Sequence, residues 1–257
     1  MNWGNRLLGM MLGGLLAGFL FNGTAFAHAR SYVWTEQYKT LPQGSFELEN
    51  WVTFKMPDGT VKNENTIQYQ EELEYGMTDH WNIAHYEIWK TKNQAGLDAS
   101  GSPKKDSTTY EGFKFETKYR IGEKGKYWLD PLLYLELEDE VREEHRNIKL
   151  EGKIVLSKDI EKLNVSYNQI MESEVDNGGR TEHEYRLGAS YEVFSGARAG
   201  VELLGNYWEP SSHRNEIAIG PSLAYEAKYF WVATGVALGA NRAADDLQAR
   251  AIAGITF

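Results

Sequence analysis

The chain has 257 residues and a formal net charge of −10, and its mean hydropathy of −0.53 excludes a polytopic helical membrane protein, because such a protein needs several runs of about 18 to 20 apolar residues. Aromatic residues make up 13% of the chain, which is too many for a disordered protein and indicates a packed core or a lipid-facing surface. The acidic balance disfavours nucleic acid as a partner, because no basic excess can displace counterions from phosphates.

The first element along the chain is predicted to be an export signal. In residues 1–27 a single charged side chain, Arg6, precedes an apolar run from Leu7 to Phe21 and a group of small residues that ends at Ala27. This order is typical of a secretory signal that is cleaved after Ala27, and the apolar run is too short for a comfortable transmembrane helix. The chain contains no cysteine, so we expect neither a disulfide framework nor acylation of a cysteine after export.

After an irregular segment, residues 28–43, the rest of the chain, residues 44–257, repeats one pattern and is predicted to form a single barrel domain. Phe113 and Phe115, for example, alternate with Lys114. Alternation with a period of two predicts β-strands that have one apolar and one polar face. The twelve predicted strands are residues 44–56, 67–75, 81–90, 113–121, 133–140, 148–156, 163–168, 184–193, 199–203, 217–225, 232–238 and 247–257.

The connections between the predicted strands alternate in length. Those after the second, fourth, sixth, eighth and tenth strands are tight, whereas most of the others are longer, such as residues 91–107 and 173–180. Aromatic residues flank four of the five tight turns, as an interfacial girdle would. Short turns on one side and longer loops on the other are typical of a transmembrane β-barrel with both termini in the periplasm. We therefore predict an all-β fold, a twelve-stranded antiparallel transmembrane β-barrel with an N-terminal signal peptide, located in the cell outer membrane.

The end of the chain supports this fold. Apolar residues occupy every second position from Leu247 to the last residue, Phe257. This pattern resembles the C-terminal strand by which Gram-negative outer-membrane barrels are recognised for assembly. The resemblance implies that Phe257 is an assembly signal, and that outer-membrane lipid and the barrel-assembly machinery are partners. A periplasmic β protein whose apolar faces form an internal core stays open as the alternative, because alternation does not tell which face is wet.

In a membrane barrel the charged faces of the strands line the lumen, and we expect much of this charge to pair across neighbouring strands. These charges either brace a narrow wet interior or line a selective pore that prefers cations or neutral solutes. Glu87, on the less regular third strand, is placed in the lumen as well, and no ring of stacked lumenal aromatic residues is expected. The predicted charge ladder consists of Lys114, Glu116, Lys118, Arg120, Glu136, Glu138, Glu140, Lys149, Glu151 and Lys153.

The first two predicted strands bring four glutamates together at the periplasmic mouth. This acidic cluster consists of Glu47, Glu49, Glu72 and Glu74. Directly opposed like charges are destabilising, so a positive group should lie near them. Residues 28–43 could fold into the lumen as a plug and bring Arg30 and Lys39 to the cluster. Pairing across the lumen with Arg198 or Lys153 explains the cluster equally well, and a bound cation is a third explanation.

Three histidine-containing groups lie near the outer ends of the predicted strands or in a loop. None matches the His-x-Ser pattern of the outer-membrane phospholipases or the acidic-plus-histidine arrangement of the outer-membrane proteases, and their spacing enforces no metal-ligand geometry. We therefore predict no enzyme, no cofactor and no metal site, and interpret these histidines as solvated. The three groups are Glu143-Glu144-His145, Glu182-His183-Glu184 and Ser211-Ser212-His213.

Two stretches carry a resemblance to known proteins. They are Glu36-Gln37-Tyr38-Lys39-Thr40-Leu41-Pro42-x-Gly44 with the following Phe46-Glu47-Leu48-Glu49, and Glu74-Tyr75-Gly76-Met77-Thr78-Asp79-x-Trp81-Asn82-Ile83-Ala84. They resemble a loosely defined group of bacterial outer-membrane barrels, often grouped with the transporter-like barrels named after the meta-pathway of phenol degradation. The resemblance implies a passive channel or transporter-like porin for small solutes and brings no catalytic residues with it. A structural or ligand-binding barrel with a closed lumen is the alternative, and an outer-membrane lipid-modifying enzyme is the second alternative.

Overall fold

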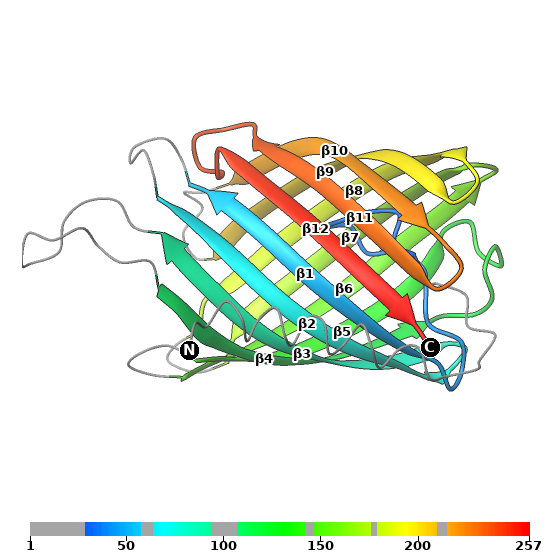
Figure 1. The fold of residues 1–257 in the computed structure, drawn as a ribbon, viewed down its shortest axis with the longest axis horizontal. Helices are drawn as coiled ribbons and strands as arrows, with labels where there is room; N and C mark the ends of the chain where they lie inside the picture. The colour runs from blue at the N-terminus through cyan, green and yellow to red at the C-terminus, as the bar shows by residue number, and fades with distance from the viewer. Residues whose placement is uncertain (1–28, 58–63, 94–106, 142–145, 176–178, 210–214) are drawn as a thin grey trace, which may run out of the picture.

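Twelve antiparallel strands close into a barrel in the structure, which is a computed structural model. Each strand pairs with its neighbours along the chain, and β1 also pairs with β12, which confirms the predicted all-β, twelve-stranded antiparallel barrel (Figure 1). The strands are β1 (Phe46–Met56), β2 (Asn65–Thr78), β3 (Trp81–Asn93), β4 (Ser107–Arg120), β5 (Asp130–Val141), β6 (Arg146–Ile160), β7 (Leu163–Glu174), β8 (Thr181–Phe194), β9 (Ala197–Glu209), β10 (Glu216–Glu226), β11 (Phe230–Gly239) and β12 (Leu247–Thr256).

The structure describes residues 29–57, 64–93, 107–141, 146–175, 179–209 and 215–257. The predicted export signal, residues 1–27, and its cleavage site lie outside the described residues. The described part of the chain holds no helix of the length and apolar character needed to cross a bilayer.

The barrel closes where the first and last strands meet. The N–H of Phe46 donates to the carbonyl of Phe257 and the N–H of Phe257 donates to the carbonyl of Phe46, both over 2.9 Å. Their rings stack with centroids 5.9 Å apart. Phe257 therefore lies at the seam of the barrel, at the end where the tight turns gather (Figure 1). Its role as an assembly signal stays a prediction.

Several strands are longer than the alternation indicates. The sequence pattern gives residues 199–203 for the ninth strand, whereas β9 runs from Ala197 to Glu209. The pattern stops early because Leu204, an apolar residue, lines a lumenal cavity and packs against the buried interior, so the apolar and polar sides are no longer distinct there. Alternation thus underestimates β9 because an apolar side chain points inward there.

The outward face of the barrel is apolar. On β5, Leu133, Leu135 and Leu137 are 43–49% exposed, whereas the intervening Tyr134 and Glu136 are buried. Side chains of a strand point alternately to its two faces, so the leucines cover the outside and the others line the inside. An apolar outer surface around a closed barrel is what a lipid-facing barrel presents.

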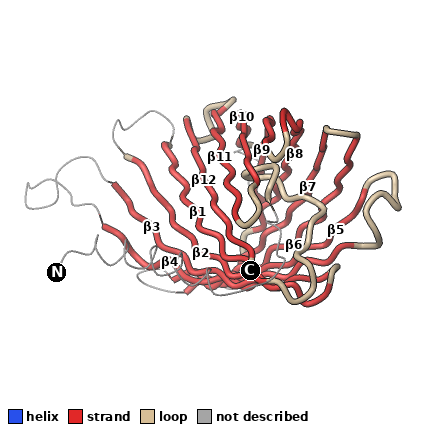
Figure 2. The backbone as a smooth tube through the Cα atoms, turned by 45° about the vertical axis from the view of Figure 1, so that its right-hand side comes forward, coloured by secondary structure: helices blue, strands red, loops and turns tan. Residues whose placement is uncertain are grey.

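The interior of the barrel is filled by its own N-terminal residues. We call residues 29–43 the lumenal segment; they run inside the ring of strands in Figure 1 (dark blue) and form the tan coil at the centre of Figure 2. Its Tyr32, Val33, Tyr38 and Leu41 side chains are at most 4% exposed. A segment without strand or helix is thus as buried as a protein core.

Glycines on the inner wall make room for this segment. A Cβ added to Gly188 on β8 would lie 2.6 Å from the ring of Tyr32, and one added to Gly235 on β11 would lie 2.8 Å from the ring of Trp34. Atoms cannot approach this closely, so only glycine allows the wall and the rings to touch as they do.

One expectation about the inner face is wrong, and its aromatic residues need a separate account. Trp51, Tyr86, Tyr134 and Trp231 are buried on the inner face, and Trp51 meets Tyr86 edge to face with ring centroids 6.5 Å apart. Trp51, Tyr134 and Trp231 belong to two buried clusters to which the lumenal segment contributes Val33, Trp34 and Tyr38. Glu87 does not face the lumen, because its neighbours Tyr86 and Ile88 take the inward positions of β3.

Candidate functional site in the lumen

The carboxylate of Glu202, on β9, anchors the lumenal segment. It accepts hydrogen bonds from three successive backbone N–H groups, those of Val33, Trp34 and Thr35, over 2.8, 2.8 and 2.7 Å. Glu202 is only 1% exposed, so these bonds form away from bulk water. Hydrogen bonds to a charged acceptor are stronger than those between neutral groups. One wall residue therefore fixes three residues of the segment at once.

Side chains of β7 hold the segment from another side. The amide oxygen of Asn168 accepts from the N–H of Glu36 over 2.6 Å, and its amide nitrogen donates to the carbonyl of Glu36 over 2.9 Å. The hydroxyl of Tyr32 donates to the backbone carbonyl of Asn164 over 2.8 Å. The two bonds of Asn168 satisfy backbone groups of Glu36 that have no strand partner, as a buried irregular segment requires.

Apolar packing completes the attachment. Val33 and Trp34 belong to one buried cluster with Trp231, Ala233 and Ile252, which lie on the inner faces of β11 and β12. Burial of apolar side chains stabilises this arrangement by removing their surface from water. The segment is thus held by both polar anchors and apolar contacts.

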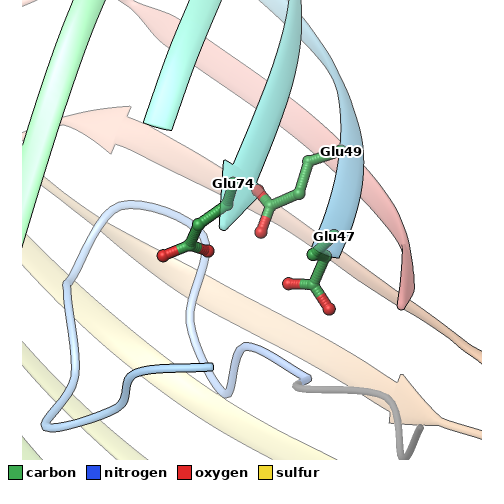
Figure 3. A group of neighbouring side chains, drawn as sticks. All are labelled: Glu47, Glu49 and Glu74. Carbon is green, nitrogen blue, oxygen red and sulfur yellow. The ribbon is translucent and has the colours of Figure 1, made fainter. Parts of the chain in front are cut away.

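The four glutamates of the acidic cluster lie together at the start of β1 and the end of β2. Glu47 pairs with Glu74 and Glu49 with Glu72 in the strand register, and each is at most 1% exposed. Figure 3 shows the Glu47, Glu49 and Glu74 side chains, whose nearest carboxylate oxygens lie within 4.8 Å of one another. Four buried carboxylates this close are stable only if basic side chains lie beside them, if some of them are protonated, or if a cation is bound.

Arg30 of the lumenal segment supplies one positive charge. Its guanidinium lies 3.2 Å from Glu49, 3.1 Å from Glu36 and 3.7 Å from Glu72, measured between the nearest nitrogen and oxygen atoms of each pair. It also stacks over the ring of Trp51, with 4.6 Å between the guanidinium carbon and the ring centroid. The lumenal segment therefore reaches the acidic cluster through Arg30.

Lys118, on β4, supplies the second positive charge. Its ammonium lies 2.9 Å from Glu74, 3.3 Å from Glu116 and 3.9 Å from Glu36. Sequence reasoning places Lys118 in the charge ladder and does not assign it to the acidic cluster. The reason is Ala84, which lies between Glu74 and Glu116 in the strand register and is too small to separate them. This small residue on the middle strand is the feature of the sequence that could have indicated that Lys118 reaches Glu74.

Glu36 is the acid that the lumenal segment itself contributes. Burial acts to raise its pKa, but the nearby cations of Lys118, Arg30 and Lys153 lower the pKa to about 2. Glu36 is therefore charged at neutral pH and bridges the two cations that face the acidic cluster. The segment and the wall thus form one network of charges.

Lys39 does not pair with a glutamate of the cluster, contrary to the plug hypothesis as the sequence suggests it. Its ammonium donates to the carbonyl of Ala29. The cause is a turn in the segment: the N–H of Ser31 donates to the side chain of Gln37 over 2.7 Å, and the Gln37 amide returns a bond of 3.0 Å. This turn brings Lys39 beside Ala29, and burial lowers the pKa of Lys39.

The two cations suggested for pairing across the lumen lie elsewhere. Arg198 bonds to the hydroxyl of Ser190 over 2.8 Å. Lys153 lies 3.0 Å from Glu151 and 3.6 Å above the ring of Tyr134. Neither has a described ion pair with the acidic cluster.

The structure brings most of the charge ladder together in ion pairs. The ammonium of Lys114 lies 2.8 Å from Glu136 and 3.3 Å from Glu138, across β4 and β5. The ammonium of Lys149 lies 3.7 Å from Glu140 on β5. Arg120 is the exception, because it donates to the backbone of the turn after β2 and stacks over the ring of Tyr38, 5.3 Å from its centroid. Paired charges of this kind brace the wall.

The remaining space in the lumen is divided into cavities. A cavity of about 190 Å³ lies toward the tight turns and is lined by Arg30 and Lys39, and one of about 120 Å³ lies behind it and is lined by Arg30 and Trp34. A third, of about 330 Å³, lies toward the other end and is lined by Trp34, Arg186 and Arg250. Of these three cavities, Arg30 and Trp34 each border two, so the lumenal segment separates the cavities from one another.

Sequence reasoning did not single out several residues of this site. Glu202 and Arg186 face the lumen by alternation, but nothing local indicates that the first accepts from the lumenal segment or that the second donates to the carbonyl of Trp34, over 2.9 Å. Arg250 is a third residue that the sequence does not single out. Its guanidinium carbon stacks over the rings of Trp34 and Trp51, 5.7 and 5.3 Å from their centroids.

Of the three histidine groups, the structure describes all residues of Glu182-His183-Glu184 alone. Residues 143–145 and 211–213 lie outside the described residues. His183 faces outward and stacks on Tyr207 with ring centroids 4.8 Å apart, whereas Glu182 and Glu184 face the lumen and line the cavity of about 330 Å³. The strand pleat therefore separates the histidine from its neighbouring acids.

Comparison with known proteins rests on structure alone. Neither a protein-family model nor a curated protein sequence matches the chain. An outer membrane channel from Pseudomonas putida F1 aligns with a TM-score of 0.65 at 11% identity, covering 88% of this chain and 100% of the channel. An anion-selective porin from Comamonas acidovorans aligns with a TM-score of 0.40 at 10% identity, over 83% of this chain and 98% of the porin, too weakly to support an argument. The chain thus shares its barrel fold with an outer membrane channel.

Proposed function

We propose that this protein is a passive channel of the cell outer membrane for small solutes and that its lumenal segment holds the channel closed. The observation that carries the proposal is a charged lumen filled by a segment that is not part of the wall. An apolar outer surface and the structural similarity to an outer membrane channel support the location and the class. Outer-membrane lipid and the barrel-assembly machinery are then its expected partners.

The lumenal segment is suited to act as a plug because its attachment is non-covalent and local. It contacts the wall through Glu202, the acidic cluster and a small apolar cluster, and its backbone takes no part in the strand ladder. Withdrawing it would join the cavities on its two sides into a continuous passage without breaking the barrel.

Withdrawal of the plug would also change the charge of the lumen. Arg30 would leave with the segment, whereas Glu49 and Glu72 would stay on the wall and lose their nearest cation. A ring of acids in a pore favours cations. The open channel is therefore expected to conduct cations in preference to anions.

Planar-bilayer recording tests the proposal. We expect the exported wild-type chain to show small or rare conductance steps, and a variant lacking residues 28–41 to show large, steady and cation-preferring steps. Heat-modifiable migration on gels must show that the variant has folded. No rise in conductance in a folded variant would overturn the plug.

A closed, non-conducting barrel is the second candidate, and the deep burial of the segment favours it. Tyr32 and Val33 are only 1% and 2% exposed, which is more typical of a permanent core than of a mobile gate. Silence of both the wild type and the folded deletion variant would establish this alternative over the channel.

A further inference from the structure

The outward face of β1, β2 and β3 carries a group of polar residues in the middle of an apolar surface. This outer polar patch consists of Asn50, Glu71, His85 and Glu87. Asn50 pairs with Glu71 and Glu71 with Glu87 in the strand register, so the residues lie side by side on three neighbouring strands. By contrast, the outward-facing Asp139 lies within three residues of a strand end.

The patch lies at the level of the lipid. It is bounded toward the tight turns by the aromatic residues Tyr75 and Trp81 and on the other side by Tyr69 and Trp89. Glu71 is four residues above Tyr75, which corresponds to roughly 10 Å along the axis of a barrel whose strands are tilted by about 40°. The apolar band of such a barrel is about 25 Å tall, so the patch lies near its middle.

Part of the patch is satisfied within the chain. His85 Nε2 lies 3.0 Å from Glu87, and the hydroxyl of Tyr110 donates to the other oxygen of Glu87 over 2.6 Å. The other ring nitrogen of His85, Nδ1, is buried and has no hydrogen-bond partner in the described structure. Glu87 therefore has two donors, whereas its histidine has an unused nitrogen.

Glu71 and Asn50 have no such partners. Among the residues that the structure describes, the Glu71 carboxylate has neither a hydrogen bond nor an ion pair, and the Asn50 side chain has no hydrogen bond. Glu71 also lies directly opposite Glu87, a second carboxylate. Lipid tails provide no donors, so polar groups at this depth are unfavourable unless another protein surface supplies them.

We propose that two copies of this chain pair through the outer polar patch. Both copies have the same orientation in the membrane, so their shared axis runs along the membrane normal and places equal depths against each other. An axis between β1 and β2 exchanges the Asn50 and Glu71 positions, so the amide of each copy, which has two donor hydrogens, meets the carboxylate of the other. The patch is one contiguous surface that contains both donor and acceptor, and a self-complementary surface of this kind produces a two-fold dimer.

The surroundings of the patch suit such an interface. Leu48, Val52 and Leu73 flank Asn50 and Glu71 on the same outward face, and Leu73 is 46% exposed. Packed against their counterparts, these side chains would exclude lipid from the hydrogen bonds. Hydrogen bonds between polar side chains hold membrane segments together in this way.

Single-cysteine cross-linking in native membranes tests the dimer cleanly, because the chain contains no cysteine. Leu73→Cys places a thiol beside the patch, and Ala189→Cys on β8 is the matched control, since both residues lie five positions from the tight-turn end of their strands. We expect oxidation to link Leu73→Cys into a species of twice the chain mass and to leave Ala189→Cys monomeric. Adding Glu71→Leu to Leu73→Cys should lower the linked fraction several-fold.

A second cysteine position and a second method distinguish loss of the dimer from a folding defect of one variant. Val52→Cys should link as Leu73→Cys does, and heat-modifiable migration should show that each variant is folded. Native mass spectrometry of the wild type in mild detergent should show a dimer that Glu71→Leu converts to monomer. Equal linking at positions 73 and 189, no linking at 52 and 73 in folded protein, or linking of these positions to a different protein would each overturn the proposal.

Discussion

The two halves of the inner wall hold the lumenal segment in different ways. On β1 to β4 the wall is charged, and the segment meets it through Arg30 and Glu36. On β10 to β12 the wall presents small residues such as Ala233 and Ala237 beside the larger Trp231, and the segment meets it mainly through apolar side chains. One half therefore recognises the segment by charge and the other by shape.

This difference has a physical consequence for opening. Ion pairs act over several ångströms and can be re-formed with water or mobile ions, so the charged half can release the segment gradually. Contacts with a close-packed wall are lost over less than an ångström. The segment therefore either fits closely against the small-residue half or loses its packing there. We therefore expect the charged half to determine how often the lumenal segment leaves the lumen. We expect the small-residue half to determine whether the segment can bind in the lumen at all.

Removing Arg30 should give the largest effect. Arg30→Leu leaves Glu49 and Glu72 buried without their nearest cation, a change that costs about 3–5 kcal/mol in buried ion pairs. The labelling rate of a cysteine placed at the buried Thr35 should rise by at least tenfold, because the segment leaves the lumen more often. Lys39→Met is the control, since the Lys39 ammonium donates to a backbone carbonyl of the segment itself, and it should have a much smaller effect. Equal labelling in the two variants would show that charge does not hold the segment.

Neutralising Glu202 should have the next largest effect. Glu202→Gln removes one of the two acceptor oxygens and leaves at least one of three buried N–H groups unpaired, at a cost of about 1–3 kcal/mol. The same Thr35 labelling assay measures it, and Glu172→Gln is the control because Glu172 pairs with Lys149 on the wall. A labelling rate that stays at the wild-type value would show that this carboxylate is not an anchor.

The sequence alone predicts the barrel well because its signal is local. Alternation with a period of two is a property of neighbouring residues, and on β5 Leu135 and Leu137 alternate with Glu136 in this way. It fails on β3, where the outer polar patch puts His85 and Glu87 outside while Tyr86 and Ile88 lie inside. On this part of β3 the apolar side chains face the lumen and the polar ones face outward, the reverse of the arrangement on β5. Alternation therefore assigns Glu87 to the wrong face.

The lumen is less predictable because its contacts join distant parts of the chain. The four glutamates of the acidic cluster lie together because β1 and β2 form a hairpin, which the sequence indicates. Glu202 is 169 positions from Val33, and no local pattern states that a carboxylate on β9 will accept from an irregular N-terminal backbone. Lys118 reaches Glu74 across an intervening strand, which requires knowledge of the register and of the small Ala84 between them.

Filling the space at Gly235 tests the small-residue half. Gly235→Ala places a Cβ 2.8 Å from the ring of Trp34 and 3.1 Å from Val33, so the segment must shift, at a cost of about 1–3 kcal/mol. We expect Thr35 labelling and channel opening to increase together. Gly152→Ala is the control, because a Cβ there meets nothing within 4 Å. If both alanine variants resemble the wild type, the wall does not depend on close fit at this position.

The smallest expected effect is the pH dependence of the contribution that Glu36 makes to holding the lumenal segment. Its pKa in the folded protein is about 2, below the ordinary value of 4.5, so its stabilising charge is fully present above about pH 4.5 and is lost as the pH falls through 2. The groups that lower it are Lys118, Arg30 and Lys153. By linkage, the difference is worth about 3 kcal/mol at most. The gap in Thr35 labelling between wild type and Glu36→Gln should therefore stay constant from pH 8 to about 5 and narrow only below about pH 4.5. A gap that closes between pH 7 and 5 would mean that Glu36 does not sit between these cations, and that the charged half of the wall holds the segment through the acidic cluster and Arg30 alone.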